Sequence, residues 1–282
     1  MPGKFKALLQ LIHFDRPTGT LLLLWPTLGA LWIAAQGTPD MALLGIFASG
    51  AFLVRSAGYI ISHLADQRSD GNVVPTPEGP LAIGTLSVNE ASLFCAALCL
   101  GAFVLVLFTN SLTIMLSLVA VLVAATYPFI KRYTNLPQLV PGIAFSFAIP
   151  MAFSAQRGDL PPALWLLFLG NLLWMVAYDT QYAKVIRAED VRSDIEPAAI
   201  LPGNADNMII AALQLMSLLA MFMAGLRFEL GLYYNTALSI AAALFFYQHH
   251  LLVGRACLKA FKFNNWVGLA VFSGIVLQYH FS

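Results

Sequence analysis

Residues 55–84, RSAGYIISHLADQRSDGNVVPTPEGPLAIG, join an apolar segment that carries one arginine to a loop rich in acidic residues, proline and glycine. Five polar or charged side chains recur there every three or four positions and would share one face of a helix: Arg55, Tyr59, Ser62, Asp66 and Asp70. A charged residue at bilayer depth costs at least about 2.5 kcal/mol, so it indicates a functional site. The stretch therefore predicts a membrane helix whose polar face and acidic end belong to a site.

The composition of the whole chain is that of a membrane protein. Hydrophobic residues make up 59% of the 282 residues and charged residues 10%, and the mean hydropathy is +0.77. Soluble domains contain about 25% charged residues, so this chain has too little polar surface to face water on all sides. It also has no basic run of the kind that binds nucleic acid. We expect an integral membrane protein whose partner is the lipid bilayer, with no nucleic acid.

Nine apolar segments approach the length of roughly twenty residues that a helix needs to cross a bilayer. They cover residues 18–36, 41–65, 88–108, 111–130, 138–155, 162–183, 207–226, 231–252 and 264–281. Pro26, Pro141 and Pro150 fall inside these segments and predict kinks. The fold class is therefore predicted to be all-α, a polytopic membrane protein with nine transmembrane helices in a bundle.

The basic residues predict the orientation of this bundle. Of the 15 lysines and arginines, 13 lie at the N-terminus or on the side of the loops that follow even-numbered spans, and Arg157 and Arg227 lie on the other side. Positive residues are enriched on the cytoplasmic side of membrane proteins. We therefore expect a multi-pass protein with a cytoplasmic N-terminus.

Two long cytoplasmic loops, residues 66–87 and 184–206, hold most of the acidic residues. They lie four spans apart, which suggests a duplicated unit within a single membrane domain. The first half would be residues 1–155 with spans 1–5, and the second half residues 156–282 with spans 6–9. Repeats of this kind commonly place a binding site between the halves. No residue-level similarity between the halves supports the duplication, so it rests on the loop positions alone.

Acidic residues at two helix ends suggest a magnesium site. Mg²⁺ is usually bound by one or two carboxylates together with substrate phosphates. Asp66 and Asp70 lie one helical turn apart, and like charges at that separation favour a cation between them. The alternative is that both are solvated acids at a helix end facing the cytoplasm. Spacing alone leaves both interpretations open.

Three further groups of residues have two interpretations each. Arg55 lies about 16 Å deeper than Asp66 along a helix, and is either a structural arginine or a receptor for a carboxylate or phosphate. Tyr127, with Lys131 and Arg132 after it, is either part of an interfacial anchor or part of a substrate site. Asp179, which is followed by Tyr182, is either capped locally or lines a polar cavity.

Several long stretches match a known family in order over nearly the whole chain. They are DRPTGTLLLLWPTLGALW at 15–32, RSAG at 55–58, AD-x-x-x-DG at 65–71, YPFIKRYTNLPQ at 127–138, IPMAF at 149–153, AYDTQYAKV at 177–185 and FNNWVGL at 263–269. In these stretches the chain resembles the UbiA-type membrane aromatic prenyltransferases. The resemblance implies a cavity that opens to the cytoplasmic face of the bacterial inner membrane, with a lateral opening to lipid for an isoprenoid tail.

The resemblance also implies a reaction. A polyprenyl diphosphate, held with Mg²⁺, loses its diphosphate, and the allylic carbocation is attacked by the ring of a 4-hydroxybenzoate-like aromatic acid, as in ubiquinone biosynthesis. Mg²⁺ and basic residues suit the leaving oxygens, and aromatic faces suit a carbocation.

The family's functional residues can be carried over to matching positions. The metal acids are Asp66, Asp70 and Asp190, and with Tyr127 they form the expected catalytic set. Arg55 matches the inner arginine near the aromatic acid. The other expected substrate-binding residues are Ser62, Arg68, Lys131, Arg132, Asp179, Tyr182 and Arg187.

The chain departs from the family pattern where the diphosphate should bind. Ser62 and His63 stand where the first motif usually has Asn-Asp, Gly79 stands at an arginine position, and Ile186 stands at the leading aspartate of the second motif. Three interpretations remain: an active enzyme with compensating groups such as Arg68 and Arg187, a non-catalytic relative that binds isoprenoid or quinone-like ligands, or a sequence that keeps the fold without the function. A transporter is disfavoured, because the outer half of the chain has few charges.

Overall fold

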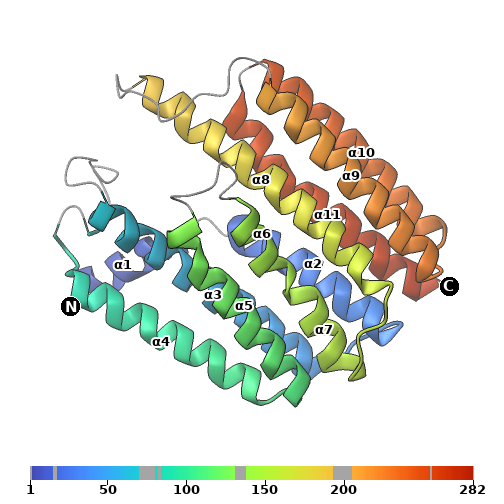
Figure 1. Cartoon of the computed structure of the whole chain (residues 1–282), viewed down its shortest axis with the longest axis horizontal. Coiled ribbons are helices and arrows are strands. Elements are labelled where there is room, and N and C mark those ends of the chain that lie inside the picture. The colour runs from blue at the N-terminus through green and yellow to red at the C-terminus, as the bar shows by residue number, and fades with distance from the viewer. Residues whose placement is uncertain are drawn as a thin grey trace. The chain divides into compact units, whose positions relative to one another are not determined.

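The structure is a computed structural model that describes residues 2–14, 18–69, 80–81, 84–130, 138–192, 205–254 and 256–281. Within these ranges every regular element is a helix (Figure 1). The helices group into two compact units. Unit 1 consists of Met1–Leu24 with Ala42–Thr109, and unit 2 consists of Trp25–Met41 with Asn110–Ser282.

The helices follow the chain as α1 (Pro2–Leu11), α2 (Thr18–Ala35), α3 (Met41–Ser69), α4 (Val88–Leu107), α5 (Ser111–Ile130), α6 (Leu139–Ser146), α7 (Ala148–Arg157), α8 (Leu164–Arg192), α9 (Ala205–Arg227), α10 (Leu232–Val253) and α11 (Cys257–Phe281). Seven helical segments of the described residues are long and apolar enough to cross a membrane, namely Thr18–Ala35, Met41–Leu64, Val88–Leu107, Leu139–Arg157, Ala205–Arg227, Leu232–Val253 and Cys257–Phe281. Ser111–Tyr127 is apolar but shorter.

The predicted all-α membrane fold is confirmed, and the predicted count of nine spans is matched only roughly. Each predicted span coincides with a helix, except that the fifth coincides with the pair α6 and α7. The helix over the sixth predicted span, α8, is not among the seven apolar segments. Its sequence is interrupted by the polar residues Asn171, Asp179 and Gln181, which lower its hydropathy.

The break between α6 and α7 follows from a proline. α6 ends at Ser146 and α7 begins at Ala148, and Pro150 follows in the first turn of α7. A proline ring clashes with the carbonyl four residues earlier and has no amide hydrogen to bond it; here that carbonyl belongs to Ser146. The helix is thus interrupted at Phe147, three residues before Pro150, where a kink was predicted. In contrast, α2 continues through Pro26, and Pro141 lies in the first turn of α6.

Unit 1 is held together by a small apolar core between three helices. Buried side chains of α1, α3 and α4 pack in one cluster: Ala7, Leu11, Ile12, Ala57, Ile60, Ala91, Cys95 and Leu98, with Leu86 before α4. Lys4 Nζ lies 2.5 Å from Glu90 Oε1. Glu90 also completes a capping box with Ser87 at the start of α4, which satisfies backbone amides that would otherwise lack a partner. The N-terminal helix is thus fixed to the start of α4.

Unit 2 packs its long helices closely through small residues. α10 lies along α11, and α8 lies along α9 (Figure 1). A Cβ placed on Gly274 of α11 would lie 2.2 Å from the Cβ of Ala237 on α10. Small residues let helix backbones approach in this way, and close packing is a main source of helix association in membranes.

The surface of α4 has the character of a lipid-facing helix. Only 17% of its apolar stretch is buried inside the protein, and Leu93, Leu100, Phe103 and Leu107 are exposed. Exposed apolar rows of this size would be a liability in water. They are the expected surface of a helix in a bilayer, as the composition predicted.

Candidate functional site

The arginine of the predicted polar face lies among aromatic rings in unit 1. Arg55 Nη2 donates a hydrogen bond to Tyr59 Oη at 3.1 Å, and the guanidinium carbon lies 4.2 Å from the centroid of the Tyr59 ring. The ring of His13 packs edge-on to Tyr59 at 5.0 Å between centroids and lies 5.8 Å from the ring of His63. Arg55 and Tyr59 therefore share one face of α3, as their spacing of four residues predicted.

The acidic end of that face is described only in part. α3 continues to Ser69, so Asp66 and Arg68 lie on the same helix as Arg55, in its last turns. Ser62 is exposed. The side chains of Asp66 and Arg68, and the whole of Asp70, lie outside the described residues, so the predicted carboxylate pair stays a prediction.

The second acidic end lies on the last turns of α8. This helix extends to Arg192 and therefore carries both Arg187 and Asp190, whose side chains lie outside the described residues. Tyr127 is partly buried near the end of α5. Lys131 and Arg132 after it also lie outside the described part of the chain, so their predicted roles are untested.

Two tyrosines of α8 enclose a phenylalanine that sequence reasoning did not single out. The ring of Phe261, on α11, stacks on Tyr178 with 4.5 Å between centroids and lies 5.3 Å from the ring of Tyr182. Asp179, between them in sequence, is partly buried, whereas Tyr182 is about half exposed. The phenols beside Asp179 thus contribute to an aromatic cluster between α8 and α11.

A chain of buried amides crosses unit 2. Trp174 Nε1 donates to Asn264 Oδ1 at 3.0 Å, and Asn264 Nδ2 donates to Gln181 Oε1 at 2.6 Å. Gln181 Nε2 donates in turn to Gln248 Oε1 at 3.0 Å, which also accepts from Gln214 Nε2 at 2.8 Å. All five side chains are buried. The chain connects α8, α11, α10 and α9.

Sequence reasoning missed these amides, although a signal was present. Gln181, Gln214, Gln248 and Asn264 each interrupt or adjoin an apolar span, where a polar side chain must find a protein partner. The hydrogen bonds that these side chains make with one another supply most of the partners they require.

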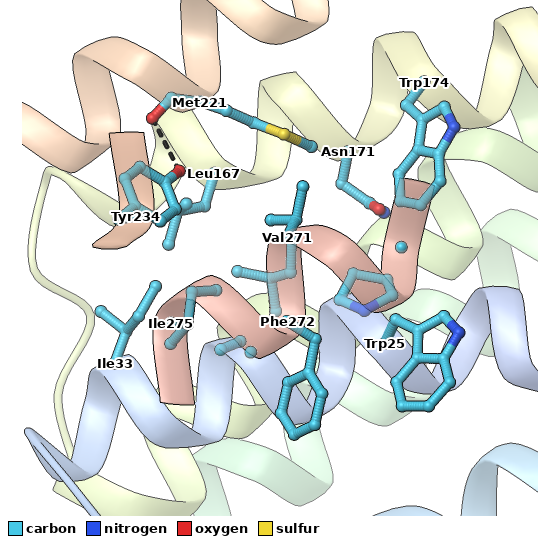
Figure 2. Close-up of a pocket in the computed structure, with 15 residues that line it drawn as sticks. Trp25, Ile33, Leu167, Asn171, Trp174, Met221, Tyr234, Val271, Phe272 and Ile275 are labelled. Carbon is cyan, nitrogen blue, oxygen red and sulfur yellow. Dashed lines mark hydrogen bonds between the residues drawn. The ribbon is translucent and has the colours of Figure 1, made fainter. Parts of the chain in front are cut away.

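Figure 2 shows a cavity in unit 2 that is lined mainly by aromatic and aliphatic side chains. Its volume is about 40 Å³, and residues of α2, α7, α8, α9, α10 and α11 surround it. Trp25 and Trp174 line one end, while Met221 and Tyr234 lie at the other (Figure 2). The hydroxyl of Tyr234 donates to the carbonyl oxygen of Met221 at 2.9 Å. The lining is therefore suited to apolar groups and to groups that benefit from aromatic faces.

One polar side chain, Asn171, interrupts this apolar lining. It is 1% exposed, and its Nδ2 donates to Ser146 Oγ at 2.9 Å. Its Oδ1 is buried, and no donor among the described residues bonds to it. Asn171 belongs to α8, so the helix with the second acidic end also contributes the polar atom of the cavity.

Known proteins resemble this chain over nearly its whole length. The model of the UbiA prenyltransferase family matches residues 23–274. A 4-hydroxybenzoate octaprenyltransferase from Ectopseudomonas mendocina (strain ymp) is 50% identical over 274 residues, which are 96% of this chain and 93% of the relative.

Two solved structures have the same fold. An apo structure of a UbiA homolog from Aeropyrum pernix K1 gives a TM-score of 0.77 at 22% identity and covers 92% of this chain and 97% of its own. A UbiA homolog from Archaeoglobus fulgidus bound to DMAPP and Mg²⁺ gives a TM-score of 0.68 at 16% identity, over 96% and 99% of the two chains. Because the family model matches most of this chain, the chain belongs to the UbiA prenyltransferase family.

Proposed function

We propose that this protein transfers a polyprenyl group from an allylic diphosphate to 4-hydroxybenzoate or a closely similar aromatic acid, a step of ubiquinone biosynthesis. The observation that carries the proposal is the 50% identity to a 4-hydroxybenzoate octaprenyltransferase over 96% of the chain. The match covers both acidic helix ends and both units, so it supports a shared reaction as well as a shared fold.

Mg²⁺ would be held on the diphosphate by Asp66, Asp70 and Asp190. These residues fit the ion by their chemistry, because carboxylate oxygens are the ligands that Mg²⁺ prefers, and α3 and α8 carry Asp66 and Asp190 in their last turns. The A. fulgidus homolog bound to DMAPP and Mg²⁺ supports the use of a divalent ion by this fold. When bound, the ion neutralises negative charge that develops on the leaving oxygens.

The chain's own cations would share this work. Arg68 and Arg187 belong to the last turns of α3 and α8, and Lys131 and Arg132 follow α5 in the sequence; in this proposal all four would contact the diphosphate oxygens. Arg55, deeper in α3, would bind the carboxylate of the acceptor, and Asp179, Tyr182, Tyr127 and Ser62 would complete the acceptor side. The bond between the allylic carbon and the diphosphate oxygen breaks, and the diphosphate leaves with the electron pair. The ring carbon ortho to the hydroxyl then bonds to the allylic carbon, and its proton passes to the released diphosphate or to water.

The second candidate is a non-catalytic protein of the same fold that binds isoprenoid or quinone-like ligands. His63, which stands where the family motif has an aspartate, lies 5.8 Å from the ring of His13. This aromatic neighbourhood favours the second candidate, because an imidazole beside another imidazole does not replace a carboxylate as a Mg²⁺ ligand.

A transfer assay separates the two candidates. Membranes that contain the protein are incubated with labelled 4-hydroxybenzoate and an allylic diphosphate, with Mg²⁺ or with EDTA. We expect prenylated product with Mg²⁺ and a loss of product with EDTA. Without the ion, the negative charge that develops on the diphosphate is not neutralised, and the diphosphate leaves too slowly. Membranes without the protein are the control. No product at high protein loading, with the labelled ligand still bound, would favour the binding protein.

We also propose that the protein lies in the bacterial inner membrane with its N-terminus in the cytoplasm, on the basis of its basic residues. In a variant without its three cysteines, Arg157→Cys should react with a membrane-impermeant maleimide added outside spheroplasts, and Lys4→Cys should react only after permeabilisation. Arg157 is the last residue of α7, and its Nε lies 2.9 Å from Asp159 Oδ1, at the surface. The opposite labelling pattern would show that the N-terminus lies outside the cytoplasm and that the proposed orientation is wrong.

A further inference from the structure

The first turn of α2 passes unusually close to Arg55 and Tyr59 of α3, and a glycine makes this possible. A Cβ placed on Gly19 would lie 2.6 Å from Tyr59 Oη, 2.7 Å from Arg55 Nε and 2.9 Å from Arg55 Nη2. Real Cβ atoms essentially never approach other heavy atoms below 3.0 Å. Gly19 itself is buried, so a larger residue could not turn away without moving one of the two α3 side chains.

Tyr59 holds the same guanidinium by a second set of contacts. It accepts a hydrogen bond from Nη2, and its ring lies under the guanidinium at 4.2 Å. Residues four apart on a helix are neighbours, which allows one side chain to make both contacts. The edge-on packing of His13 on the Tyr59 ring fixes the ring in turn. The side chain of Arg55 is therefore restricted by α2 on one side and by an anchored ring on another.

These restrictions suit an arginine whose guanidinium must face its ligand in one orientation. A guanidinium recognises a carboxylate through two parallel hydrogen bonds in one plane. Arginine has large rotamer freedom, and binding is stronger when that freedom is already lost before the ligand arrives. A free, exposed arginine would lose it only on binding.

We infer that Gly19 and Tyr59 are positioning residues that orient Arg55 for the carboxylate of the aromatic acceptor. This inference rests on the proposed function, and it assigns to Gly19 and Tyr59 a role in selecting an acid over a neutral ring of the same shape. Gly19→Ala displaces the guanidinium, whereas Tyr59→Phe keeps the ring and removes only the hydrogen-bond acceptor.

The test compares two acceptors, 4-hydroxybenzoate and the neutral 4-hydroxybenzamide, in the transfer assay. In Gly19→Ala we expect the KM for 4-hydroxybenzoate to rise about tenfold or more, with the KM for the allylic diphosphate within about twofold of the original. The preference for the acid over the amide, as the ratio of kcat/KM values, should fall by a similar factor. A general loss of folding would lower the kcat/KM values for both acceptors by the same factor and leave their ratio unchanged.

Two further variants sharpen the test. Gly50→Ala, on α3, is the matched control, because no atom of the described part of the chain lies within 4 Å of a Cβ placed there; it should keep the original preference. Tyr59→Phe should lower the preference a few-fold. In the Gly19→Ala, Tyr59→Phe double variant, the loss should be smaller than the product of the single losses, because the hydroxyl nearest to the new methyl group is gone.

Equilibrium binding of labelled 4-hydroxybenzoate to the purified full-length protein gives the same comparison without turnover. If the protein binds and transfers but Gly19→Ala behaves as Gly50→Ala does, the positioning role is overturned and the proposed function stands. If the unmodified protein binds the acid without transferring to it, the catalytic function fails and the positioning role is still tested by affinity. No binding of the acid at all would overturn both.

Discussion

Asp66→Asn is expected to lower the rate of prenyl transfer by about 10²–10³-fold, the loss typical when one group that stabilises transition-state charge is removed. Asparagine keeps the size of the side chain and one oxygen but loses the negative charge that Mg²⁺ requires. The Mg²⁺ concentration for half-maximal rate should therefore rise as well. Initial rates over a Mg²⁺ series, at saturating diphosphate and acceptor, measure both effects.

Asp40→Asn is the control for this change. Asp40 is an exposed aspartate just before α3, and its backbone amide donates to Gln156 Oε1 at 3.2 Å, a contact that the substitution leaves in place. Its rate and Mg²⁺ dependence should match those of the original protein. If the Asp66→Asn variant keeps both the original rate of prenyl transfer and the original Mg²⁺ dependence, the metal is not held at the end of α3.

The second large effect concerns stability and is expected for Gln248→Met. Gln248 Oε1 accepts from both Gln181 and Gln214, so its removal leaves two buried amide donors without an acceptor. Interhelical hydrogen bonds in membranes contribute on average about 0.6 kcal/mol each, and a donor left buried without a partner adds to this loss. We expect the free energy of unfolding to fall by about 2–3 kcal/mol, measured by denaturant unfolding in mixed micelles.

A second variant separates loss of a bond from loss of packing. Gln214→Met removes one donor, while Gln248 Oε1 keeps its bond from Gln181. Its effect should be about half that of Gln248→Met. Equal effects for the two variants would mean that packing around α9 and α10, and not the shared acceptor, determines the stability.

The sequence predicted features that depend on local order along the chain. Apolar length predicted the helices, spacing placed Arg55 and Tyr59 on one face, and Pro150 predicted the break before α7. It did not predict contacts between distant helices. Trp174 and Asn264 are 90 positions apart, and nothing in the periodicity of either helix says that the two helices are neighbours.

The same limit applies to the aromatic cluster and to the glycine beside Arg55. Phe261 lies between Tyr178 and Tyr182 because α8 and α11 pack together, which is a property of the tertiary fold. Gly19 lies in a matched family stretch, yet only coordinates show which atoms a Cβ would meet. The predicted convergence of Asp66, Asp70 and Asp190 on one ion stays a prediction, since their side chains lie outside the described residues.

The length of α3 and α8 has a consequence for the donor substrate. Each has 29 residues and is therefore about 44 Å long, against about 30 Å for the hydrocarbon layer. Each helix can thus extend well into the headgroup region. Drawing an isoprenoid out of lipid would cost about 0.8 kcal/mol per methylene-sized group. If the donor binds at either helix end, as proposed, its tail would stay dissolved in the leaflet and its diphosphate would stay hydrated, so lateral diffusion would deliver it without extraction.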